Sequence, residues 1–204
     1  IFSATSKANN AQKKTESEEY VLILNSYNES SPWSNSITTP IVHKIAEIEK
    51  MNAYIEHLNL FMVSDSTKIE KFSEALFSRY GSTPPRLLFF VGSMSLIFRE
   101  EIQALWGDVP AIVCGADPYV YHEEFYRQRD MVSPNERTHM SELAKEYNFT
   151  YMHTPVYLEE SVKLMQRMIP GMKKLVFLGD GIYPNPEYDK QLQKVIKEKY
   201  PQMD

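Results

Sequence analysis

Short, continuously apolar runs punctuate the chain from residue 20 onward, and longer stretches of mixed character separate them. Turn-forming residues close these runs, as in the Gly92-Ser93 pair and the Gly115-Ala116-Asp117 triplet. Such runs are typical of strands that are buried on both faces of a sheet. We therefore predict strands at Tyr20–Leu24, Leu58–Val63, Leu87–Val91, Val109–Cys114 and Leu175–Leu178.

The stretches between the runs carry apolar residues at the spacing of an amphipathic helix. The clearest example is the isoleucine series at positions 37, 41, 45 and 48. Pro40 interrupts this series, so the helix either begins near Thr39, with Pro40 in its first turn, or is kinked. Further helices are predicted over residues 67–80, 97–106, 133–147, 162–169 and 186–200.

Buried strands that alternate with amphipathic helices predict an α/β fold with a doubly wound parallel sheet and helices on both faces. A 2-1-3-4-5 strand order fits this pattern, which does not by itself fix the order. Residues 1–18 lack hydrophobic periodicity and are rich in Ser, Thr, Asn, Lys and Ala. We expect them to form a flexible leader between the domain and a removed signal peptide or an anchor.

Polar and aromatic residues gather where the predicted strands end. Ligands of open α/β sheets bind outside the carboxyl ends of the strands, so these residues form a candidate rim. Ser93 and Asp117 are assigned to the rim from this geometry alone. Hydroxyls, carboxylates and aromatic rings there could hydrogen-bond a small polar solute and stack against its apolar face. The same residue types end strands and cap helices in any α/β protein, so both interpretations stay open.

Charge and cysteine content narrow the candidate functions. A formal net charge of -5, with 22 Lys and Arg residues scattered along the chain, argues against nucleic acid as a partner. No apolar stretch approaches the roughly 20 residues needed to span a bilayer. The single cysteine, Cys114, has no second thiol to pair with, and the histidines lack metal-site spacing. We therefore predict no metal and no cofactor.

Motifs of the common catalytic and nucleotide-binding sites are missing from the sequence. The turn after the first predicted strand contains no glycine, unlike the GxGxxG pattern of dinucleotide-binding folds. The chain has neither a GxxxxGK[ST] phosphate loop nor a GxSxG nucleophile elbow, and residues 92–96 come nearest to the latter. We expect a non-catalytic domain. An enzyme with an unrecognised site stays an alternative, because a fold does not determine function.

Two segments resemble a family of bacterial extracytoplasmic sensor domains. In residues 21–37, VLILNSYNESSPWSNSI, a strand is followed by Ser-Tyr and then by Pro-Trp at the start of a helix. In residues 155–185, a helix ending in Ile-Pro precedes a strand ending in Gly-Asp. These domains are similar to ABC-transporter substrate-binding proteins of the type I periplasmic-binding fold. They precede membrane-spanning histidine kinases, often hybrid ones, and sometimes diguanylate cyclases.

The resemblance implies two similar α/β lobes that close over a small solute. It makes residues 19–154 the first lobe and residues 155–204 the crossover and the beginning of a second lobe. The family's motifs would place Ser26, Tyr27 and Trp33 at the rim of the first lobe, opposite Asp180 and Tyr183 of the second. Because one helix follows Asp180, either the second lobe is truncated, which we favour, or the last strand joins the first sheet and no cleft exists.

The resemblance also implies a role in signal input. We expect the domain to be periplasmic or otherwise extracytoplasmic, and anchored to the inner membrane in the full-length protein. A small-molecule solute would be its ligand, and a membrane-linked histidine kinase in the same polypeptide, part of a two-component system, would receive the signal. Sensors of this kind are expected to act as homodimers. The alternative is a solute-binding lipoprotein of an ABC transporter, which shares the fold and the cleft.

Overall fold

A five-stranded parallel sheet forms the centre of the molecule. The structure is a computed structural model that describes residues 19–63, 66–121, 137–179 and 185–203. The strand order is β2-β1-β3-β4-β7, which is the 2-1-3-4-5 arrangement of a doubly wound sheet. The strands are β1 (Glu19–Asn25), β2 (Met51–His57), β3 (Leu87–Val91), β4 (Ala111–Ala116) and β7 (Phe149–His153). The predicted α/β fold is confirmed.

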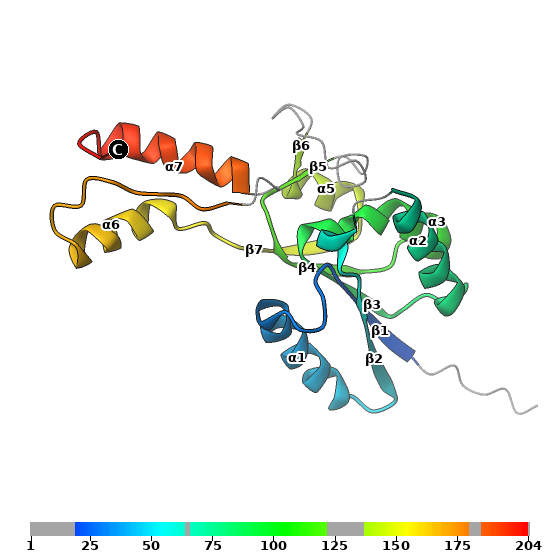
Figure 1. Ribbon diagram of the computed structural model, residues 1–204. Helices are drawn as coiled ribbons and strands as arrows, with labels where there is room; N and C mark the ends of the chain where they lie inside the picture. Colours follow the sequence, from blue (N-terminus) through cyan, green and yellow to red (C-terminus); the bar gives the residue numbers. More distant parts are fainter. Residues whose placement is uncertain (1–18, 64–65, 122–136, 180–184, 204) are drawn as a thin grey trace, which may run out of the picture.

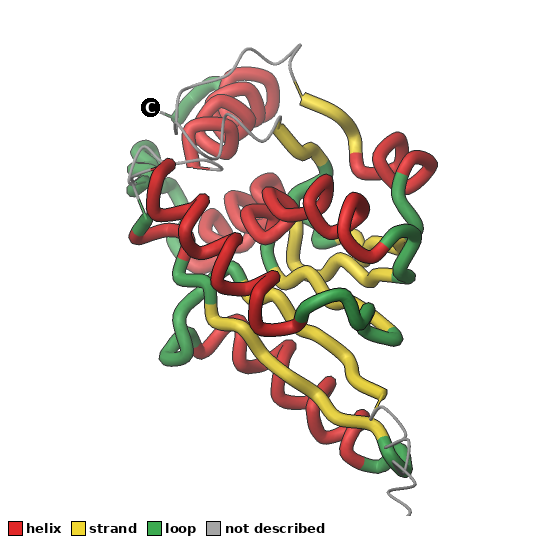
Figure 2. Tube along the Cα trace, turned by 90° about the vertical axis from the view of Figure 1, so that its right-hand side faces the viewer, coloured by secondary structure: helices red, strands yellow, loops and turns green. Residues whose placement is uncertain are grey.

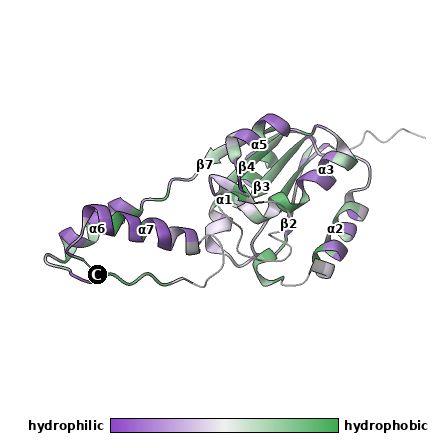
Figure 3. Ribbon diagram, turned by 90° about the horizontal axis from the view of Figure 1, so that it is seen from above, coloured by the Kyte–Doolittle hydropathy of each residue, from purple (hydrophilic) through white to green (hydrophobic). Residues whose placement is uncertain are grey.

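Helices cover both faces of the sheet (Figures 1 and 2). Helix α1 (Pro32–Ala46) packs on one face, where Val21 and Ile23 of β1 point. The other face, with Leu22 and Leu24, packs against α2 (Ser66–Tyr80), α3 (Arg99–Trp106) and α5 (Met140–Glu146). Successive strand residues point to opposite faces, so a strand covered on both must be apolar throughout. This explains the uninterrupted apolar character of β1 and the hydrophobic strands at the centre of Figure 3.

Helix α1 begins earlier than the position of Pro40 suggested. Its N-cap is Ser31, whose hydroxyl accepts a hydrogen bond from the Ser34 amide, and Pro32 occupies the first turn. Pro40 lies inside the helix and is exposed. A start near Thr39 was therefore wrong. The exposed side of the helix tolerates proline because water can bind the carbonyl that the missing N–H leaves unpaired.

The predicted strand at Leu58–Val63 is wrong. The second strand of the chain is β2, which begins at Met51, seven residues before the predicted start at Leu58. Within the predicted strand, Leu60–Met62 form a short 3₁₀ helix, η1. Leu58 and Leu60 are buried in the main hydrophobic core, and their backbone amides donate to the carbonyls of Asn25 and Ser26 at 2.8 and 2.9 Å. The apolar run therefore folds under the carboxyl edge of the sheet instead of extending it.

The predicted strand at Leu175–Leu178 is also absent from the structure. Residues 172–179 run between α6 (Leu158–Met168) and α7 (Asn185–Lys199) without pairing with any described strand. Leu175 and Phe177 pack into a small cluster with the two helices, while Val176 and Leu178 are exposed. The fifth strand of the sheet is β7, so this segment does not join the first sheet as one alternative required.

Two predicted segments begin at residues that the structure does not describe, and one described pair of strands was not predicted. The leader at residues 1–18 and the helix start predicted at residue 133 lie outside the described residues, whereas the end of that helix is α5. The antiparallel pair of short strands β5 (Tyr119–Tyr121) and β6 (Arg137–His139) was not predicted. Among the described helices, none is both long and apolar enough to cross a bilayer.

Candidate functional site

A pocket of about 230 Å³ lies at the carboxyl edge of the sheet. Residues at or just after the carboxyl ends of β1, β3, β4 and β7 line it, together with one side chain each from α1, η1 and α7. We call it the rim pocket. It is lined by Tyr27, Trp33, Phe61, Ser93, Met94, Gly115, Ala116, Asp117, Thr154 and Tyr188.

Ser26 lies behind the pocket wall and joins two of its loops. Its side chain is fully buried, and its hydroxyl donates to the carbonyl of Gly92 at 3.1 Å and accepts from the amide of Ser95 at 2.8 Å. The β1 loop is thereby fixed against the β3 loop. Ser26 therefore positions the residues on either side of it and does not line the pocket itself.

Two glycines allow aromatic rings to lie directly on the strand ends. Gly92 and Gly115 have φ angles of +85° and +61°, a region that residues with a Cβ rarely adopt. A Cβ on Gly92 would lie 2.8 Å from Cε2 of Tyr27, and one on Gly115 would lie 2.2 Å from Cη2 of Trp33. Because Gly92 and Gly115 lack a Cβ, the rings of Tyr27 and Trp33 can pack against the backbone at the ends of β3 and β4.

Three aromatic side chains form that wall. The ring of Tyr27 stacks on Phe61, with 4.9 Å between centroids, and meets Trp33 at 5.0 Å with the planes tilted by 59°. Trp33 is 43% exposed although it is a large apolar side chain. Exposed aromatic surface beside a cavity is a typical platform for a flat ligand.

Asp117 is held at the pocket by hydrogen bonds with the hydroxyl groups of Ser93 and Tyr188. Ser93 Oγ donates to one carboxylate oxygen at 3.1 Å and accepts from the Asp117 amide at 2.9 Å. The hydroxyl of Tyr188 donates to the other oxygen. Burial raises the pKa of Asp117 above its usual value, and the hydrogen bonds from Tyr188 and Ser93 lower it in part. The carboxylate is thus well oriented but poorly solvated.

The two tyrosines near this carboxylate stay protonated at neutral pH. Burial, with a further contribution from the negative charge of Asp117, raises the pKa of Tyr27 to about 12. Burial and the hydrogen bond to Asp117 also raise the pKa of Tyr188. Both phenols are therefore neutral groups that can donate a hydrogen bond.

The structure brings together four of the residues predicted from the sequence. Tyr27, Trp33, Ser93 and Asp117 all line the rim pocket. Asp180 and Tyr183 lie outside the described residues. Contact of these side chains with a ligand stays a prediction.

Sequence reasoning missed several residues that line the pocket. Phe61 belongs to the run that was interpreted as a strand, which would have hidden its role. Tyr188 lies on α7, 71 positions after Asp117, and no local motif connects the two. Met94 follows Ser93 directly and could have been included as a strand-end neighbour. Thr154 comes after β7, a strand that was not predicted.

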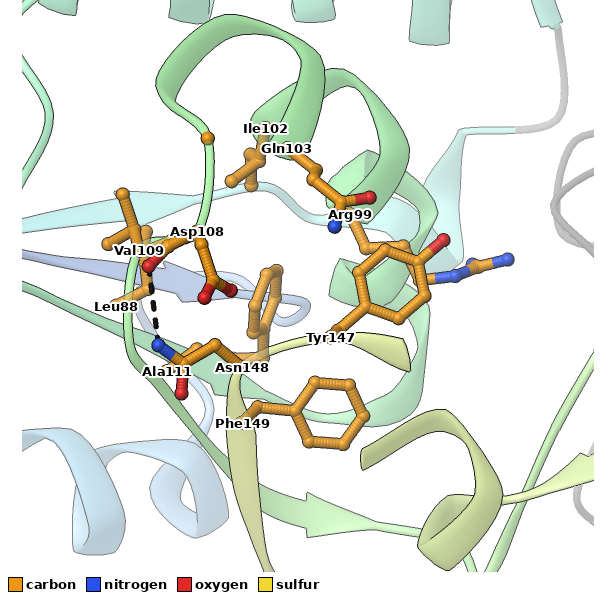
Figure 4. Close-up of a pocket in the computed structure, with 12 residues that line it drawn as sticks. Leu88, Arg99, Ile102, Gln103, Asp108, Val109, Ala111, Tyr147, Asn148 and Phe149 are labelled. Carbon is orange, nitrogen blue, oxygen red and sulfur yellow. Dashed lines mark hydrogen bonds between the residues drawn. The ribbon is translucent and has the colours of Figure 1, made fainter. Parts of the chain in front are cut away.

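A second cavity lies at the opposite, amino-terminal edge of the sheet (Figure 4). It has a volume of about 30 Å³ and is lined mainly by apolar side chains from β3, α3, β4 and β7. Asp108 and Asn148 flank it, and the Asn148 amide donates to the Asp108 carbonyl at 3.2 Å. A space of this size holds about one or two water molecules, so it is not a candidate ligand site. In the ranges that the structure describes, no group of three or more His, Cys, Asp or Glu side chains could hold a metal ion.

Comparison with known proteins relates this chain to others by fold. No family model matches the sequence, and no curated protein matches it. A conserved domain protein from Vibrio cholerae O1 biovar El Tor superposes with a TM-score of 0.55 at 9% identity, over 88% of this chain and 54% of that one. The chain shares its fold.

A second solved structure supports the same conclusion. The ABC domain from Streptococcus pneumonia, in complex with L-Trp, superposes with a TM-score of 0.51 at 13% identity, over 89% of this chain and 54% of that one. The chain spans about half the length of both structures. At this low identity the likeness concerns the α/β fold alone.

Proposed function

We propose that the chain is a small-solute-binding domain that acts as the extracytoplasmic input of a membrane-bound sensor histidine kinase. The observation that carries the proposal is the rim pocket, which combines aromatic walls with a buried carboxylate at the edge where α/β sheets bind ligands. The binding of L-Trp by a protein of similar fold is consistent with a small organic ligand.

The pocket lies between two parts of the chain, and this supports a signalling role. The hydrogen bond from Tyr188 to Asp117 joins α7 to the β4 loop. An ion pair at 3.3 Å between Arg137 of β6 and Glu187 of α7 makes a second connection. A solute in the pocket would bias the position of α7 relative to the sheet, and such a bias is the thermodynamic basis of a ligand-driven switch.

The proposal extends to the rest of the polypeptide. A chain that spans about half the length of its structural matches leaves room for a second lobe that would complete the site. We infer that the kinase follows that lobe across the inner membrane, and that the sensor works as a dimer. A solute-binding lipoprotein that feeds an ABC transporter is the second candidate. The fold that this chain shares with the ABC domain from Streptococcus pneumonia, which is in complex with L-Trp, favours this candidate.

A solute screen on the full-length natural protein tests the proposal. The melting temperature is measured with amino acids including L-Trp, amines, sugars, nucleosides and short peptides. We expect at least one solute to raise it by mass action, and Trp33→Ala to remove this shift. Leu105→Ala serves as the matched control, since Leu105 is 42% exposed and lies on α3, outside the lining of the pocket.

The outcomes of the screen separate the alternatives. A solute that both stabilises the protein and changes its autophosphorylation supports the sensor. A solute that stabilises a polypeptide without kinase activity supports the transporter-feeding protein. If no solute stabilises the protein, or Trp33→Ala leaves the shift unchanged, ligand binding at the rim pocket is wrong.

A further inference from the structure

The rim pocket has a pronounced charge asymmetry. Among the described residues that line it, Asp117 is the sole charged side chain, and no Lys, Arg or His joins it. Arg137, which is not among the lining residues, forms an ion pair with Glu187 at 3.3 Å, and its guanidinium lies over the Tyr119 ring, 4.4 Å from the ring centroid. Among the described residues, the side-chain donors to the carboxylate of Asp117 are the neutral hydroxyls of Ser93 and Tyr188.

A carboxylate in this state can still accept hydrogen bonds. An ionised carboxylate offers about four lone-pair sites, and hydrogen bonds from the side chains of Ser93 and Tyr188 use two of them. Burial is unfavourable for the charged form of a carboxyl group, which is why the pKa of Asp117 is raised. A ligand with a positive charge would relieve this cost, and an anionic ligand would increase it.

The walls of the pocket favour the same kind of ligand. Tyr27, Trp33 and Phe61 form a continuous aromatic surface, and Tyr188 adds a further ring beside the carboxylate. The negative faces of aromatic rings attract organic cations, with Trp the most effective. The same rings bury the flat apolar body of a ligand.

We propose that the rim pocket binds an organic amine, with its ammonium group hydrogen-bonded to Asp117 and its flat apolar body against Trp33 and Tyr27. The inference rests on the proposed solute-binding function and names the ligand class of that site. It excludes anionic solutes, and it makes the positive charge, rather than the apolar body alone, the source of specificity.

Three related ligands test the inference on the full-length natural protein. Tryptamine carries a primary ammonium group, indole lacks it, and indole-3-acetate carries a negative charge on the same ring system. Calorimetric titration is expected to show that tryptamine binds more tightly than either of the others by about tenfold or more, as for a charge-assisted hydrogen bond. This comparison needs no variant, so it does not depend on whether a substituted protein folds.

A pair of isosteric substitutions locates the effect. Asp117→Asn removes the pocket charge, and the expected result is a loss of about tenfold or more in tryptamine affinity with the affinity for indole unchanged. Asp108→Asn removes the same charge from an exposed residue at the opposite edge of the sheet, and both affinities should stay as they are.

The failure of this inference is distinguishable from failure of the proposed function. If indole or indole-3-acetate binds as tightly as tryptamine, or Asp117→Asn keeps the preference for tryptamine, the pocket binds solutes but not through an ammonium group. If the solute that stabilises the protein most carries no amine, the inference is equally overturned. If none of the three ligands and no solute of the wider screen binds, the proposed function itself is wrong, and the inference is overturned with it.

Discussion

Single glycines decide how closely the aromatic side chains approach the strand ends. Gly115 combines a φ of +61° with a position where a Cβ would lie 2.2 Å from Cη2 of Trp33. Gly81 has nearly the same φ, +59°, but open space around the same position. The two glycines therefore share the backbone strain that a side chain would cause and differ in the steric conflict with the pocket wall.

Alanine substitution at the two glycines separates these effects. We expect Gly81→Ala to lower the free energy of unfolding by about 1–2 kcal/mol, the cost of a left-handed backbone. Gly115→Ala should cost about 1–3 kcal/mol more, because Trp33 must also move. Urea unfolding measures both values. Equal losses in the two variants would show that Trp33 does not pack on Gly115 as described.

Asp117 should make the stability of the protein depend on pH. Its raised pKa means that the folded protein holds the proton more tightly than the unfolded chain, whose carboxyl group has a pKa near 3.8. Stability therefore falls as the pH rises through the window from that value to the raised pKa, and it is regained on acidification. Asp117→Asn lacks this contribution.

The comparison with the isosteric variant measures this dependence. We expect the free energy of unfolding of the natural protein, relative to that of Asp117→Asn, to increase when the pH is lowered from about 7 to about 4. Urea unfolding of both proteins at each pH gives the difference. A decrease on acidification would mean that the pKa of Asp117 is lowered in the folded protein.

At the scale of elements, the short helix η1 contributes Phe61 to the pocket lining and anchors itself to the core through Leu60. Leu60 is buried beneath the β1 loop, whereas its neighbour Met62 is 76% exposed. Leu60→Ala should therefore cost about 2–5 kcal/mol by leaving a cavity, while Met62→Ala should stay within about 0.5 kcal/mol. Thermal unfolding of the two variants tests this difference. Similar effects would contradict the burial of the 58–63 run under the sheet edge.

The strands that sequence reasoning found and missed differ in their place in the sheet. Strands β1, β3 and β4 lie at its centre, where both faces are covered and an unbroken apolar run is required. The missed strands, β2 and β7, are its two edges, and they include exposed Tyr54 and Met152. Their mixed sequences carry no continuous run, so apolar segments that pack elsewhere were predicted in their place.

Three of the pocket residues that the sequence predicted come just after the carboxyl ends of the central strands. Tyr27, Ser93 and Asp117 follow the ends of β1, β3 and β4, which the sequence identified. Phe61 and Tyr188 could not be found in this way, because their positions depend on how η1 and α7 pack against the sheet. Long-range packing of this kind leaves no local signature in the sequence.

At the scale of the whole molecule, α6, residues 172–179 and α7 form a C-terminal unit beside the sheet (Figures 1 and 3). Its small core includes Val162, Leu192 and Met203. The bond between Tyr188 and Asp117 and the ion pair between Arg137 and Glu187 connect it to the sheet. Among the described residues, these two polar contacts join the C-terminal unit to the sheet, and a boundary with few such contacts favours relative motion of the two parts.

Removing one of these contacts should loosen the unit. Tyr188→Phe deletes the hydroxyl that donates to Asp117, a charge-assisted bond of about 1.5–3 kcal/mol. We expect faster cleavage of residues 185–203 in limited proteolysis. Tyr157→Phe, which changes a tyrosine that is 60% exposed, should leave the cleavage rate unchanged. Equal rates in all three proteins would mean that the Tyr188 contact does not hold α7.

The central claim is that a small solute binds in the rim pocket between the sheet edge and α7. Hydrogen exchange of the full-length protein, with and without the solute that stabilises it most, tests this claim most directly. The account predicts that protection increases at residues 26–27, 93–94 and 115–117 and in α7, because the bound solute restrains both sides of the pocket. Protection confined to the opposite edge, around Asp108 and Asn148, would contradict it.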